Sequence, residues 1–120
     1  MVLVKENLIT VAGSITESVR RVRKANNRNL LVEVEVRNLT ELNETLGLNA
    51  GRILLDNMNL EGLREAVRMV GGRVPLEASG QVTMDNVRAI AATGVDFVSV
   101  GALTHSVRAL DISFLVEPLA

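Results

Sequence analysis

Arg52-Ile53-Leu54-Leu55-Asp56-Asn57-Met58 has the form of a short buried strand that ends in an acid. Arg52 to Leu55 is predicted to be the strand. Its three consecutive apolar residues indicate cover on both faces, which is typical of a parallel strand in an α/β protein. Asp56 stands where the strand should end, and a helix-like segment begins at Asn59. A carboxylate in that position would lie at the carboxyl rim of a sheet or barrel, where α/β folds keep their chemistry.

The composition is that of one globular domain, expected to span residues 1–120. Hydrophobic residues make up 48% of the chain and charged residues 22%, which argues against disorder. The net charge of −1, the lack of a basic run and the presence of only two aromatic residues give no reason to expect a nucleic acid as partner. No apolar run reaches the roughly 20 residues of a membrane helix, and the N-terminus lacks a signal-peptide layout.

Cysteine and histidine usage limits the metal chemistry. The absence of cysteine excludes disulfides and cysteine-ligated zinc and is compatible with a reducing cytoplasm, the predicted location. The single histidine, His105, excludes a histidine-rich metal centre within one chain.

Outward from the first stretch, the chain alternates strand and helix patterns five times. The predicted strands are Val2–Val4, Leu30–Val36, Arg52–Leu55, Val74–Ala78 and Asp96–Val100. Glu6 to Gly13 is interpreted as a link. Helices are then predicted after a capping box at Ser14 and Glu17, after Asn38, at Asn59 and after an N-cap at Thr83, with short helices over Leu103–Ala109 and Asp111–Glu117.

Repeated βα units predict an α/β fold, here five consecutive units of a TIM-like barrel with parallel strands and outer helices. Five units cannot close a barrel, and open edges favour aggregation. The strands could flatten into a flavodoxin-like sheet, two chains could associate, or the chain could be a partly folded remnant. We favour a homo-oligomer, because Glu33 and Glu35 alternate with Val32, Val34 and Val36 and would otherwise point from the inner face without a partner.

The strand ends then meet at one rim. The residues at these ends are Lys5, Glu35, Asp56, Ser79 and Gly101. Ser79-Gly80 and Gly101-Ala102 are interpreted as turns that leave backbone amides open at helix starts, where phosphate binds. Carboxylates beside a phosphate favour Mg²⁺. The residues therefore predict a site for a phosphorylated small molecule with Mg²⁺.

Each of these features also has an ordinary structural explanation. A strand-end acid can be a helix cap or part of a loop salt bridge, and small residues are common in turns. Glu33 lies deeper and can serve a buried polar network. His105 either reaches the phosphate from the Gly101 turn or is a surface histidine on a short helix. Five such residues in register on one rim favour the functional interpretation.

The motifs also occur together in a known order. They are Lys5-Glu6-Asn7, Ala12-Gly13-Ser14, Val32-Glu33-Val34-Glu35-Val36, Ile53-Leu54-Leu55-Asp56-Asn57-Met58, Leu76-Glu77-Ala78-Ser79-Gly80, Thr93-Gly94-Val95-Asp96, Val100-Gly101-Ala102-Leu103-Thr104-His105-Ser106 and Ala109-Leu110-Asp111. This set resembles the C-terminal barrel part of the quinolinate phosphoribosyltransferases, also called nicotinate-nucleotide pyrophosphorylases (carboxylating), over nearly the whole chain.

The resemblance implies a pentosyltransferase of NAD biosynthesis that forms nicotinate mononucleotide, pyrophosphate and CO₂ from quinolinate and phosphoribosyl pyrophosphate with Mg²⁺. It implies that Lys5 contacts the anionic groups of the substrates and that Glu35 and Asp56 lie near the ribose and the Mg²⁺-pyrophosphate, so that both can hold the metal directly or indirectly. Ser79, Gly80, Gly101, Ala102 and His105 are then the phosphate-binding residues.

The departures from the family matter equally. Family members are far longer, and their N-terminal domain, earlier barrel strands and neighbouring subunit supply a histidine and arginines to the quinolinate pocket. Leu8 stands where a histidine is usual, and Gln81 where a second glycine is usual. Three functions therefore stay open: quinolinate phosphoribosyltransferase activity, a truncated or engineered half-barrel that self-associates and at most binds phosphate without turnover, and a different activity on a phosphorylated sugar.

Overall fold

The computed structural model describes residues 1–105 and 109–118 and contains one five-stranded parallel sheet. The strands pair in sequence order, each with the next along the chain. They are β1 (Val2–Val4), β2 (Val32–Val36), β3 (Arg52–Asp56), β4 (Leu76–Ser79) and β5 (Phe97–Val98). The five predicted strands are confirmed, with β2, β4 and β5 beginning one or two residues later than predicted.

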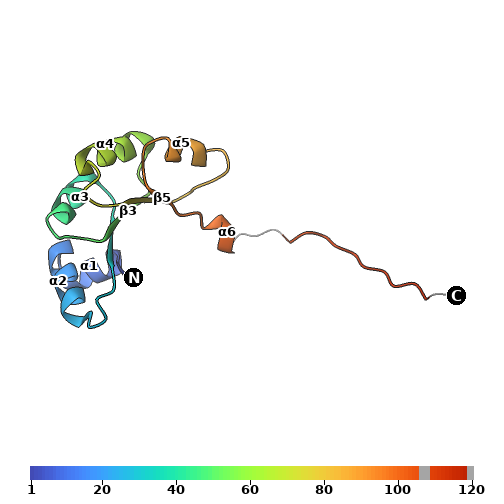
Figure 1. Cartoon of the computed structure of the whole chain (residues 1–120), viewed down its shortest axis with the longest axis horizontal. Coiled ribbons are helices and arrows are strands. Elements are labelled where there is room, and N and C mark those ends of the chain that lie inside the picture. Colours follow the sequence, from blue (N-terminus) through green and yellow to red (C-terminus); the bar gives the residue numbers. More distant parts are fainter. Residues whose placement is uncertain (106–108, 119–120) are drawn as a thin grey trace.

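Among the described residues, the second to fifth helices pack along one side of this sheet, whereas the last helix buries no residue. The helices are α1 (Glu6–Ala12), α2 (Ile15–Ala25), α3 (Leu39–Leu46), α4 (Leu60–Val70), α5 (Val87–Ala91) and α6 (Ala102–His105). Figure 1 shows α2 to α5 following the convex side of the sheet, while the concave side carries no helix from this group. This one-sided arrangement is the wall of a βα barrel. A flavodoxin-like sheet would have its first two strands exchanged in order, so the flattened alternative is wrong.

The hydrophobic core lies between the sheet and the helices. Val34, Val36, Ile53 and Leu55 are fully buried on the helix-facing side, and each contributes about 1.5–3 kcal/mol by leaving water. The period of two in β2 then turns Glu33 and Glu35 to the concave side. The predicted inward direction of both glutamates is therefore confirmed.

Side-chain hydrogen bonds cap the starts of α2, α3 and α4. Ser14 Oγ accepts a hydrogen bond from the Glu17 N–H at 3.1 Å, and Asn38 and Asn59 cap α3 and α4 in the same way. The second half of the predicted capping box is wrong, because the Glu17 carboxylate pairs with Arg20 and Arg21 instead. The N-cap predicted at Thr83 is also wrong, since α5 begins at Val87.

Two segments differ from their predicted secondary structure. The segment from Glu6 to Ala12, predicted to be a link, is helix α1 and ends at Gly13, whose φ is 91°. The helix predicted over Asp111–Glu117 is wrong, because residues 109–118 form neither helix nor strand and lie exposed. Figure 1 shows this segment reaching away from the sheet. Of the helix predicted over Leu103–Ala109, α6 confirms the first part, and residues 106–108 lie outside the described residues.

Candidate functional site

The strand ends meet at the rim as predicted. In the paired register, Val4 of β1 stands opposite Val34 of β2, so Lys5 follows at the level of Glu35. Glu35 stands opposite Leu54, and Asp56 stands opposite Ser79. Lys5 follows β1 at once, Glu35 is the penultimate residue of β2, and Asp56 and Ser79 end β3 and β4. These residues therefore lie near one edge of the sheet.

The pKa of the Glu35 carboxyl depends on the charges of neighbouring residues at the rim. Partial burial raises the pKa of the Glu35 carboxyl, and the negative charge of Asp56 raises this pKa further. The Lys5 ammonium and a hydrogen bond from the Glu6 backbone act in the opposite direction. The charges of Lys5 and Asp56 thus both act on the Glu35 carboxyl.

Asp56 is half-buried and faces the loop after β3. Its Oδ2 accepts a hydrogen bond from Asn57 Nδ2 at 2.9 Å, and the Asn57 N–H donates to the Ser79 carbonyl at 2.8 Å. Asn57 has a φ of 52°, a conformation that asparagine tolerates better than most residues. This residue therefore orients Asp56 and joins the ends of β3 and β4.

The turn after β4 is a strained loop and not a helix start. Gly80 and Gln81 both have positive φ, 104° and 48°, and α5 begins only at Val87. The expectation that Ser79-Gly80 opens a helix is therefore wrong. Within the described residues, the N–H groups of Gly80 and Gln81 donate to no acceptor of the chain, so this loop offers backbone donors without a helix.

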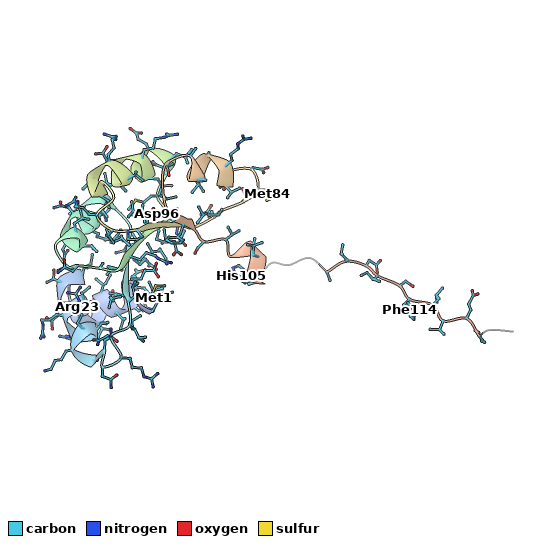
Figure 2. All side chains as sticks on the ribbon, viewed as in Figure 1. Met1, Arg23, Met84, Asp96, His105 and Phe114 are labelled. Carbon is cyan, nitrogen blue, oxygen red and sulfur yellow. The ribbon has the colours of Figure 1, made fainter. Side chains whose placement is uncertain are left out.

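The turn after β5 does begin a helix, as predicted. Gly101 precedes Ala102, the first residue of α6. A Cβ added to Gly101 would lie 2.6 Å from His105 Nε2, so the imidazole rests directly on this glycine. Figure 2 shows His105 on α6. His105 is exposed on this short helix, so it matches the description of a surface histidine, and its contact with a phosphate stays a prediction.

Beneath the rim, charged side chains join four strands across the concave face. Arg52 Nη1 donates to Glu77 Oε2 at 2.8 Å, and Arg52 Nε lies 3.8 Å from Glu33 Oε1. Ser99 Oγ donates to Glu77 Oε1, and the Arg52 guanidinium lies 4.1 Å from the centre of the Phe97 ring. The sequence suggested a buried role for Glu33 but missed Arg52, although Arg52 has the same strand parity as Asp56.

Burial and nearby charges shift the pKa values of the two acids in this cluster, Glu33 and Glu77, in opposite directions. Burial and the Glu77 charge raise the pKa of the Glu33 carboxyl, which is 2% exposed. Burial also raises the pKa of Glu77, but hydrogen bonds from Ser99 and Arg52 outweigh it and bring this pKa below its usual value. Glu77 is therefore the charged partner of Arg52.

The rim acids suit Mg²⁺ shared with a substrate better than a metal cage. Mg²⁺ is usually bound through one or two carboxylates together with phosphate oxygens and water. Glu35 and Asp56 supply two carboxylates, and no group of three or more acidic, histidine or cysteine side chains in residues 1–105 and 109–118 could hold a metal ion. These residues fit a metal that arrives with a phosphorylated ligand.

Sequential parallel strands, helices on one face and a polar rim of strand ends define a domain of the βα-barrel type. Residues 1–115 match the family described as "Quinolinate phosphoribosyl transferase, C-terminal domain". The chain belongs to this family. In the described residues, no helix is both long and apolar enough to cross a membrane.

Individual relatives agree with this assignment. The chain is 42% identical to the chloroplastic nicotinate-nucleotide pyrophosphorylase (carboxylating) of Arabidopsis thaliana, over 98% of this chain and 39% of the relative. It is 35% identical to a probable enzyme of the same name from Bacillus subtilis, over 93% and 39%. The nicotinate-nucleotide pyrophosphorylase structure from Francisella tularensis superposes with a TM-score of 0.86 at 45% identity, over 93% and 40%. The chain thus spans about two fifths of the length of these relatives.

Proposed function

We propose that this chain carries the phosphoribosyl pyrophosphate side of a quinolinate phosphoribosyltransferase site. The observation that supports the proposal is the gathering of Lys5, Glu35 and Asp56 at the ends of β1, β2 and β3. The donors of the Gly80 and Gly101 turns stand at the ends of the next two strands. A cation, two carboxylates and backbone N–H groups match a ligand that contains a ribose, a phosphate and a pyrophosphate.

Each group has a chemical task in this proposal. Lys5 neutralises anionic groups of the substrates, and the carboxylates of Glu35 and Asp56 accept hydrogen bonds from ribose hydroxyls. The N–H groups of Gly80 and Gly101, with Ser79, Ala102 and His105, hold the phosphate. Mg²⁺, when bound with Glu35 and Asp56, supplies positive charge to the departing pyrophosphate. Charge stabilisation and positioning, without a protein nucleophile, account for the reaction.

A direct experiment compares turnover with binding in the purified chain. Nicotinate mononucleotide formation from quinolinate and phosphoribosyl pyrophosphate would establish activity. Binding of phosphoribosyl pyrophosphate by calorimetry, lost without Mg²⁺ and weakened at least about tenfold in Asp56→Asn, would support the rim assignment. Glu61→Asn on the exposed surface of α4 is the control for the lost charge. Equal binding by wild type and Asp56→Asn would contradict the assignment.

The second candidate is a half-barrel that binds phosphate without turnover. Arg37, the cation nearest in sequence to Glu35, forms ion pairs with Glu6 and Glu41, so its charge is already engaged at the rim. Quinolinate carries two carboxylates, and cationic side chains make the strongest hydrogen bonds to such groups. Phosphoribosyl pyrophosphate binding without nicotinate mononucleotide formation would favour this candidate.

We also propose that the chain forms a homo-oligomer. Leu110, Ile112, Phe114 and Val116 recur at every second position and are about four-fifths exposed, as Figure 2 illustrates at Phe114. A period of two in apolar residues favours a strand with one buried face, and β1 and β5 each have one neighbour in the described sheet. Light scattering after gel filtration tests this proposal: Phe114→Lys should shift the chain toward a monomer, and Ser113→Lys should not. A monomeric wild type would contradict it.

A cytoplasmic location stays part of the proposal and rests on the lack of cysteine. The Arabidopsis thaliana relative is named chloroplastic, so fractionation of the native cells is the deciding measurement.

A further inference from the structure

One side chain on the concave face, that of Arg52, lies close to residues of three other strands. Arg52 belongs to β3, its Nη1 reaches Glu77 of β4 at 2.8 Å, and its guanidinium covers the Phe97 ring of β5 at 4.1 Å. Its Nε lies 3.8 Å from Glu33 of β2. Arg52 therefore spans four neighbouring strands, which no apolar side chain of similar size could do with the same directional contacts.

Stability alone does not explain this cluster. The Arg52 side chain is 25% exposed, and those of Glu33 and Glu77 are 3% and 10% exposed. Charges so far from water lose much of their attraction to desolvation, and apolar replacements of buried ion pairs are often neutral or stabilising. Glu33 Oε1 moreover has no hydrogen-bond partner among the described residues. The cluster thus costs free energy of folding. A role in fixing the relative positions of the strands would explain why the chain contains it.

The register connects this geometry with the rim. Arg52 pairs directly with Glu33, and Glu35 and Asp56 lie further along the same two strands on the same face. A slip of one residue between β2 and β3 would turn one of the rim acids toward the helices. A directional contact at Arg52 opposes that slip and holds the strands at a fixed separation below the rim.

We propose that Arg52 is a positioning residue, which joins β2 to β5 across the concave face and thereby sets the relative positions of Glu35 and Asp56. The meaning of this role for catalysis rests on the proposed function, whereas the role in positioning does not. Functional groups need supporting contacts that hold them to within about 0.5 Å, and Arg52 supplies such contacts one side-chain layer below Glu35 and two layers below Asp56.

The deciding variant removes the charges without opening a cavity. Glu33→Leu, Arg52→Met and Glu77→Leu are combined in one chain, because Arg52→Met alone would leave two buried acids together. Arg64→Met, on the exposed surface of α4, is the control for the same change of residue. Global stability is measured by urea unfolding, so that a local effect can be separated from a general loss of stability.

Two measurements report on the geometry of the rim. The first is amide hydrogen exchange at Asn57, whose N–H donates to Ser79, and at Ser99, whose N–H donates to Ala78. We expect both amides in the triple variant to exchange at least about tenfold faster relative to the α4 amides. The second is binding of magnesium pyrophosphate, which we expect to weaken about tenfold or more. Arg64→Met should leave both readouts unchanged.

The outcomes separate this inference from the proposed function. Rim amides that exchange within about twofold of the wild-type rate in a folded triple variant would overturn the positioning role. If the triple variant does not fold, Arg52→Lys decides by the same exchange ratio, because an ammonium cannot reproduce the planar fork. A wild-type chain that binds no magnesium pyrophosphate would contradict the proposed function, and hydrogen exchange would still decide the role of Arg52.

Discussion

Gly80 and Asn57 lie so close together that only a glycine fits at position 80. A Cβ built on Gly80 would stand 2.3 Å from Asn57 Oδ1 and 3.0 Å from the Asn57 backbone N. Gly80 also has a φ of 104°, which L-residues with a side chain rarely adopt. This contact places the loop that follows Asp56 directly against the turn that follows Ser79.

Gly80→Ala is therefore expected to lower the free energy of unfolding by about 2 kcal/mol or more, from backbone strain together with the clash. Gly72→Ala is the matched control. Gly72 also has a positive φ, 74°, but a Cβ there would meet nothing within 4 Å, so we expect a loss of only about 1 kcal/mol. Urea unfolding of both variants measures the difference, and equal losses would show that the contact with Asn57 is unimportant.

Gln81→Gly should stabilise the chain. Gln81 has a φ of 48°, a left-handed conformation that costs a residue with a Cβ roughly 1–2 kcal/mol. Glycine removes that strain but adds unfolded-state entropy of about 0.4–1 kcal/mol, so a net gain of roughly 0.5 kcal/mol is expected. Gln81→Ala keeps the Cβ and should bring no gain. A higher urea midpoint for Gln81→Ala than for Gln81→Gly would argue against strain at this position.

Local sequence rules predicted the parts of the fold that depend on neighbours in the chain. The alternation from Val32 to Val36 placed the glutamates on the concave face because strand parity needs no tertiary information. The end of α4 at Gly71 was also predicted correctly. Gly71 takes the left-handed conformation of a C-cap, which glycine adopts without help from tertiary contacts. The resemblance to a family added the expected roles of the rim residues.

Features that depend on distant or competing contacts were not predicted. Arg52 meets Glu77 from a strand 25 residues away, and a diagonal contact of this kind has no periodic signal. The start of α5 was misplaced because Asn86 Oδ1 accepts from the Thr83 N–H, which turns the expected cap into part of the preceding loop. The prediction of a helix over Asp111–Glu117 did not take into account that the apolar residues there recur at every second position. Such a period does not place them on one face of a helix.

Ser14→Ala should weaken α2. The Ser14 side chain satisfies the Glu17 N–H at 3.1 Å, and loss of such an N-cap costs about 1 kcal/mol. Ser14→Asn retains an acceptor at the same position and should remain within a few tenths of a kcal/mol of the wild type. Thermal and urea unfolding measure both variants. A loss in Ser14→Asn as large as that in Ser14→Ala would show that capping of the Glu17 N–H is not what the hydroxyl contributes.

Glu17 should make stability fall in acid. Hydrogen bonds from Arg20 and Arg21 lower the pKa of Glu17 from 4.5 to about 2. Because the folded-state pKa is depressed, the contribution of Glu17 is present above pH 4.5 and is lost as the pH falls toward about 2. Glu17→Gln should therefore flatten the stability profile in this range, and added salt should reduce the difference, since the pair is exposed. A difference that grows on acidification would contradict this ion pair.

Glu35 should make the stability of the folded chain fall as the pH rises, opposite to the effect of Glu17. Burial and the charge of Asp56 raise its folded-state pKa above 4.5, so the folded chain holds this proton more tightly than the unfolded chain. The resulting stability is full below pH 4.5 and is lost as the pH rises through the raised pKa. Urea unfolding across this range should show the wild type losing stability relative to Glu35→Gln, with Glu61→Gln as the control for net charge. In Asp56→Asn the loss should be smaller, because the neighbouring charge is gone. A loss of unchanged size in Asp56→Asn would mean that burial alone sets the Glu35 pKa and that the two rim acids do not act together.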